Sequence, residues 1–96
     1  MTRQEIIESL KNLRKEAASN YNAEIVGIFG SYARKEPRED SDLDILVRFN
    51  NNASLLDLSG LTDYLGDKLN IKVDVLSERA IRKEIKAKIL AETVYL

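Results

Sequence analysis

Ninety-six residues are enough for one domain and too few for two, so we expect residues 1–96 to fold as one domain with a modest core. Fifteen basic against sixteen acidic residues leave a net charge of −1, which is not the basic character of proteins that track a nucleic-acid backbone, and direct nucleic-acid binding is not expected. The chain has no histidine and no cysteine, which excludes disulfides, imidazole catalysis and thiolate metal sites and leaves carboxylate sites suited to magnesium, manganese or calcium.

The first predicted element is a helix that begins after Thr2. Thr2 and Glu5 form a capping-box pattern, and apolar residues then recur every three or four positions. The short apolar run 25–29 is typical of a buried strand. Residues 31–34 are expected to form a helical turn, and a polar loop follows over 35–41.

The next predicted strand, 42–49, separates its residues by chemistry. Its odd positions are all apolar, whereas the other face carries Asp42, Asp44 and Arg48, with Leu46 as the exception. Because side chains alternate along a strand, the two aspartates are expected to lie together on the face away from the core.

A leucine-rich helix and a third strand are predicted next. Ser54 and Asp57 are expected to cap the helix, and its leucine stripe from Leu55 to Leu69 is expected to face the core. The strand over 71–76 places Asp74 opposite its apolar face.

The last predicted element is a helix capped by Ser77, with isoleucines one turn apart. Its basic residues are a solvated face in the simpler interpretation and a nucleotide or partner contact in the other. The apolar tail 93–96 is expected to dock either on the body of the protein or on a partner.

Together these elements predict an α/β (α+β) fold, a single mixed β-sheet with helices packed against it. The short link between the first two strands favours an antiparallel pair. The N-terminus lacks the apolar stretch of a signal peptide, and no apolar run approaches the roughly 20 residues of a membrane span. We therefore expect a cytoplasmic protein without membrane contact.

Three aspartates are the candidate metal ligands. Asp42 and Asp44 share one strand face, and Asp74 on a later strand can complete the set. Unpaired carboxylates crowded on one face are costly, and a divalent cation reverses that cost. We expect two magnesium ions, with manganese as the alternative, and a role in phosphoryl or nucleotidyl transfer.

Gly30 and Ser31 are the candidate phosphate ligands. Glycine lets the backbone approach a phosphate closely, and the helical turn after it offers free N–H groups. Arg34 could add positive charge to a triphosphate, or could instead be a surface residue or an ion-pair partner of Glu36 or Asp40.

These residues together carry a family resemblance. Gly30-Ser31, ten further residues and Asp42-Leu43-Asp44 resemble the G-S-x10-D-x-D signature of the polymerase β-like nucleotidyltransferase superfamily. Within it the chain resembles the minimal nucleotidyltransferases (MNT), which are single short domains. The resemblance implies the polymerase β-like fold, with Asp42 and Asp44 as metal ligands and Asp74 as third carboxylate and base.

The resemblance also implies a partner. Relatives of this kind accompany a small helical HEPN protein as antitoxins, and some transfer AMP from ATP to a tyrosine of that toxin. We therefore expect a magnesium-dependent enzyme that transfers a nucleoside monophosphate from ATP, or another nucleoside triphosphate, to a partner hydroxyl.

Two alternatives remain at this point. The same fold could neutralise its partner by occlusion alone, without catalysis. An acidic pocket of the response-regulator kind would also gather aspartates around magnesium. It would place them at the carboxyl ends of strands, whereas Asp42 and Asp44 open theirs.

Overall fold

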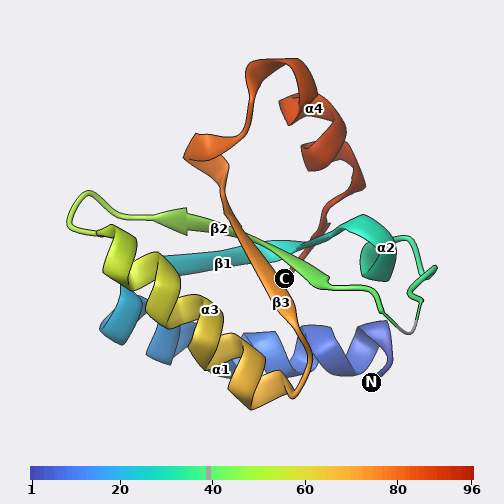
Figure 1. Cartoon of the computed structure of the whole chain (residues 1–96), viewed down its shortest axis with the longest axis horizontal. Coiled ribbons are helices and arrows are strands. Elements are labelled where there is room, and N and C mark those ends of the chain that lie inside the picture. The colour runs from blue at the N-terminus through green and yellow to red at the C-terminus, as the bar shows by residue number, and fades with distance from the viewer. Residues whose placement is uncertain (39) are drawn as a thin grey trace.

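Helices α1 (Arg3–Tyr21) and α3 (Leu55–Leu69) lie side by side against one face of a β-sheet in the computed structural model of the chain (Figure 1). The structure describes residues 1–38 and 40–96. Apolar residues of both helices and of the sheet are buried between these two layers and form the hydrophobic core. No helix in the described part of the chain is long and apolar enough to cross a membrane.

Four strands form one sheet in the order β3-β2-β1-β4, and their bounds are β1 Ala23–Phe29, β2 Leu43–Phe49, β3 Val73–Ser77 and β4 Val94–Tyr95. Strand β1 pairs antiparallel with both β2 and β4, whereas β2 and β3 are parallel. The mixed sheet and the antiparallel first pair predicted from the sequence are therefore confirmed.

Two of the three predicted helix caps, at Thr2 and Ser54, are present. Glu5 N donates to Thr2 Oγ1 at 3.1 Å, and Thr2 N donates back to Glu5 at 2.8 Å. At α3, Ser54 N donates to Asp57 Oδ2 at 2.9 Å, which completes a second capping box. Each box satisfies backbone donors that the first helical turn leaves free, and so fixes where the helix begins.

The predicted turn after β1 is the short helix α2 (Gly30–Ala33), and a polar loop leads from it to β2. Residue Glu39 of that loop lies outside the described residues. Along β2, Leu43, Ile45 and Val47 are fully buried against the helical layer, as their alternation predicts.

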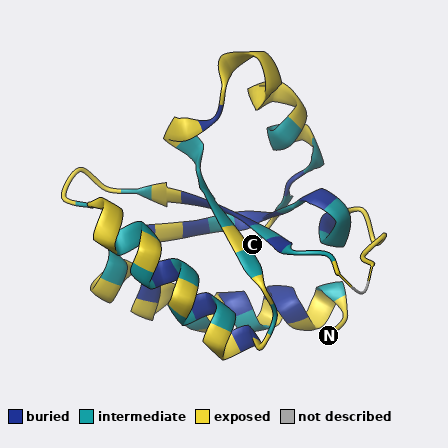
Figure 2. Ribbon diagram, viewed as in Figure 1, coloured by how far each residue is buried: buried dark blue, intermediate teal, exposed yellow. Residues whose placement is uncertain are grey.

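The leucine stripe of α3 is only partly core, which corrects one prediction. Leu61, Leu65 and Leu69 are buried, but Leu55 is 82% exposed. The start of α3 is accordingly coloured as exposed in Figure 2. Leu55 is the first residue of the helix, and its neighbour Leu56 is also exposed, so α3 begins beyond the core. Periodicity identifies a face of a helix but not where its contact with the body begins.

The last helix begins later than predicted. Ser77 makes no capping hydrogen bond and leads into a 3-10 helix, η1 (Glu78–Ala80), and α4 then runs over Lys83–Glu92. Ile81 is buried in the link between them and so does not share a helical face with Ile85, which is 45% exposed. Ile81 has an extended backbone, so the continuous helix that the isoleucine spacing predicts does not form.

The C-terminal tail docks on the body of the protein. Val94 and Tyr95 pair with Ile28 and Gly27 of β1, and Leu96 N donates to Val26 O at 3.1 Å. A side chain at Gly27 would collide with the backbone carbonyl of Val94. Gly27 therefore permits the close approach of β4.

Gly27→Ala is expected to displace β4 and to lower the free energy of unfolding by about 1–3 kcal/mol, the usual cost of overpacking. Gly66→Ala is the matched control, because a Cβ in the middle of α3 would meet Ile71 O at 3.6 Å, an ordinary contact, and alanine favours helix. Urea denaturation measures both, and equal stability of the two variants would contradict the assigned role of Gly27.

Candidate active site

The parallel pairing of β2 and β3 brings two of the three predicted aspartates together. Asp44 and Asp74 are direct Cα partners in the register of these strands. Side chains at paired positions point to the same face of a sheet, here the face opposite the helical layer. Asp42 lies two residues before Asp44, directly ahead of β2.

A cleft of about 490 Å³ opens beside Asp44. Five of the six predicted site residues line it: Gly30, Ser31, Arg34, Asp42 and Asp44. Asp74 is not among the lining residues and lies exposed beside Asp44 on β3. The cleft therefore lies between the turn after β1 and the start of β2, the two segments that carry the predicted motif.

Gly30 is in direct contact with the Asp44 carboxylate. Its φ of +74° lies in the left-handed region that favours glycine. A Cβ at this position would overlap Asp44 Oδ2. Position 30 thus requires glycine for two reasons, its left-handed backbone and the absence of room for a Cβ beside Asp44. The turn after β1 can therefore pack directly on the Asp44 carboxylate.

The pKa of Asp44 is raised to about 6 from its usual 3.8. Burial is the largest cause, because it disfavours the charged form, and the negative charges of Asp74, Asp42 and Glu92 act in the same direction. The positive charge of Arg34 lowers the pKa in part. A strongly shifted carboxylate in a cleft, surrounded by like charges, is a typical feature of functional sites.

The chemistry of these donors fits a divalent metal ion, since they are all carboxylate oxygens. Among residues 1–38 and 40–96, no three such side chains are converged in a metal-holding arrangement. Adjacent strands lie about 4.8 Å apart, so Asp44 and Asp74 are close enough to share an ion with no change of strand register. A cation would also relieve the repulsion that raises the pKa of Asp44.

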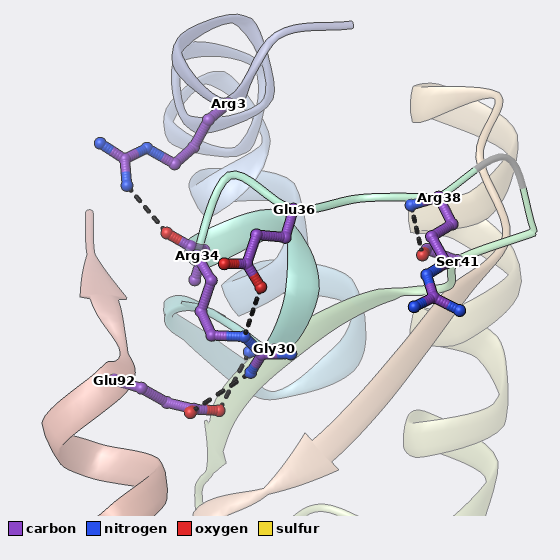
Figure 3. A network of polar contacts seen from close by, with 8 residues as sticks. Arg3, Gly30, Arg34, Glu36, Arg38, Ser41 and Glu92 are labelled. Atoms are coloured by element: carbon purple, nitrogen blue, oxygen red, sulfur yellow. Dashed lines mark hydrogen bonds and ion pairs between the residues drawn. The ribbon is translucent and has the colours of Figure 1, made fainter.

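Arg34 belongs to a small polar network at the edge of the cleft (Figure 3). Its guanidinium lies 3.7 Å from Glu36 and 3.4 Å from Glu92. Glu92 Oε1 also accepts a hydrogen bond from Gly30 N at 3.2 Å. Arg34 thus takes part in a predicted ion pair, with Glu36, while its side chain also lines the cleft.

Glu92 is a cleft residue that the sequence did not indicate. It is the last residue of α4, and 62 positions separate it from Gly30. One signal was present, since an acidic residue in the last turn of a helix is unfavourable to the helix dipole. An acidic residue at the C-terminal end of a helix is therefore a candidate for a specific contact, and Glu92 contacts Gly30 and Arg34.

Comparison with known proteins places this chain in a family. A family model described as a nucleotidyltransferase domain matches residues 10–96. The protein adenylyltransferase MntA of Thermococcus cleftensis is 38% identical over 96 residues, which cover 100% of this chain and 97% of that protein.

Solved structures show the same fold. A candidate minimal nucleotidyltransferase superposes with a TM-score of 0.79 at 36% identity, covering 100% of this chain and 97% of the other. A structure of the tri-AMPylated Shewanella oneidensis HEPN toxin in complex with MNT antitoxin matches with a TM-score of 0.71 at 17% identity, covering 98% and 71%.

The family match, together with the fold shared with these relatives, makes this chain a nucleotide-transferring enzyme. The chain belongs to the nucleotidyltransferase domain family, and within it to the minimal nucleotidyltransferases.

Proposed function

We propose that this nucleotidyltransferase transfers AMP from ATP to a hydroxyl on a partner protein, a tyrosine of a HEPN-type toxin, and so acts as an antitoxin. It would do so as a single domain in the cytoplasm. The observation that carries the proposal is the register pair of Asp44 and Asp74 beside the Gly30 turn. The name of the MntA relative and the toxin complex of the fold neighbour support the choice of acceptor.

In the proposed reaction the acceptor oxygen attacks the α-phosphorus of ATP. The bond from that phosphorus to the bridging oxygen of the β-phosphate breaks, and pyrophosphate leaves. Asp74, which is exposed and adjacent to Asp44, takes the proton of the acceptor hydroxyl.

The remaining site residues bind and orient the nucleotide. Asp42 and Asp44, with Asp74 as third ligand, would hold magnesium or manganese, two ions in our proposal, which when bound would neutralise charge on the phosphates and the leaving group. Gly30 N–H and Ser31 would bind the triphosphate, and Arg34 would add positive charge at its edge.

The position of the label in ATP tests this reaction. We expect magnesium-dependent labelling of the HEPN-type partner from ATP labelled at the α-phosphate and none from ATP labelled at the γ-phosphate. A partner with its tyrosines replaced by phenylalanine is the control and should remain unlabelled. Labelling from the γ-phosphate would instead mean phosphoryl transfer, and no labelling of a folded partner would contradict catalysis.

A non-catalytic antitoxin is the second candidate. Leu55 and Leu56, both more than 80% exposed at the start of α3, provide an apolar surface that a partner could cover. Occlusion predicts that a variant lacking Asp42 and Asp44 still neutralises the toxin in cells, whereas our first proposal predicts that it does not.

A further inference from the structure

Glu92 occupies the donors that the proposed function assigns to the triphosphate. Its Oε1 accepts the Gly30 N–H at 3.2 Å, and its Oε2 lies 3.4 Å from Arg34 Nη1 (Figure 3). One carboxylate therefore satisfies a backbone donor and a guanidinium that both face the cleft. Two oxygens of a phosphate group would satisfy the same pair.

We infer that the Glu92 carboxylate competes with the nucleotide for the same donors. It occupies the position of a phosphate group in the nucleotide-free enzyme and must move away when ATP binds. This inference rests on the proposed function and adds to it a residue that sets affinity for the triphosphate. In this account Glu92 is not a metal ligand and touches no reacting atom.

The contacts of Glu92 are weak enough for a phosphate group to replace its carboxylate. The side chain of Glu92 is 24% exposed and that of Arg34 is 49% exposed, and ion pairs with this access to water are weak. Glu92 also lies at the C-terminal end of α4, where the helix dipole disfavours an anion, and near Asp44, whose pKa it helps to raise. Only Gly30 and Arg34 favour its present position among the contacts of described residues.

The backbone beside Glu92 is held independently of its carboxylate. The hydroxyl of Thr93 donates to Ile89 O at 2.7 Å, and β4 pairs with β1 directly after it. Displacement of Glu92 therefore needs only rotation of its side chain. Glu92 can therefore leave its contacts without disturbing β4.

Glu92→Gln tests the inference, because glutamine keeps the shape and one oxygen acceptor but loses the charge. We expect calorimetry to show MgATP binding roughly five- to tenfold tighter than in the wild type, as when a competing state of about 80–90% occupancy is removed. Inorganic tripolyphosphate with magnesium should gain affinity by a similar factor, because the competition is for phosphate and not for the base.

Asp40→Asn is the matched control. Asp40 lines the same cleft, and among the described contacts its carboxylate touches neither Gly30 nor Arg34. Loss of its charge should change affinity less than about twofold, which measures general repulsion of the triphosphate.

The inference is overturned if Glu92→Gln binds MgATP more weakly than the wild type, or no more tightly than Asp40→Asn. It is also overturned if ATP gains affinity while tripolyphosphate does not. If neither ligand binds to the folded wild type or to any variant, the nucleotide site of the proposed function is what fails.

Discussion

Asp44→Asn is expected to slow AMP transfer severely and, in metal-free buffer, to make the protein more stable than the wild type. Loss of the carboxylate should lower the transfer rate by roughly 10³-fold, since a bound metal contributes several kcal/mol of charge stabilisation. Stability should rise because burial and neighbouring carboxylates disfavour the charge of Asp44. Single-turnover transfer and thermal unfolding in EDTA measure the two effects.

The stability gain is expected to depend on pH in a defined direction. The pKa of Asp44 is about 6 in the folded protein and near 3.8 when unfolded, so between these values the folded chain binds more protons. Wild-type stability therefore falls as the pH rises from about 4 to about 6, and it stays lower above that range. Asparagine removes this loss, so the variants should converge below pH 4.

The size of the gain follows from the exposure of Asp44. The pKa difference would amount to about 3 kcal/mol for a fully buried carboxyl, but Asp44 is only half-buried, and we expect about 1 kcal/mol. That corresponds to a rise in Tm of roughly 4–8 °C in a domain of this size. Asp63→Asn on the exposed side of α3 should change stability by less than about 0.5 kcal/mol. An Asp44→Asn protein as labile as the wild type at pH 7 would contradict the assigned electrostatics.

Gly30→Ala is expected to reduce transfer by about 10²-fold or more and to destabilise the fold. Alanine at φ +74° costs about 1–2 kcal/mol. Its Cβ would also overlap Asp44 Oδ2 and push the carboxylate out of place, and small displacements of a catalytic group cost about 10² in rate. Transfer kinetics and urea denaturation of the purified variant check both effects.

A double-mutant cycle separates backbone strain from the collision. In an Asp44→Ala background the overlapping oxygen is absent, so Gly30→Ala should cost about 1 kcal/mol less than in the wild type. If the two stability changes are simply additive, the contact between Gly30 and Asp44 does not constrain the turn.

Local sequence signals predicted most of the architecture because they were strong and mutually consistent. The capping boxes at Thr2 and Ser54 fixed two helix starts, and the alternation along β2 predicted which of its residues pack against the helical layer. The same alternation placed Asp44 opposite the core. These features depend on residues within a few positions of one another, which is the range that a sequence pattern reports.

The incorrect predictions concern contacts between distant segments. Leu55 fits the helical stripe of α3, but its turn extends beyond the core. Ile81 fits the spacing of the last helix, but it lies buried in an extended link after η1. Glu92 reaches Gly30 and Arg34 only because β4 and α4 return to β1, and no local spacing encodes that path.

The register of β2 and β3 also limits how such a domain can change in length. Since side chains alternate, adding or deleting one residue of β3 directly ahead of Asp74 would turn Asp74 toward the helices and bring an apolar neighbour level with Asp44. An added residue in the turn 50–53, outside both strands, would leave their pairing intact. Length variation should therefore accumulate in that turn, while β3 keeps its residue count.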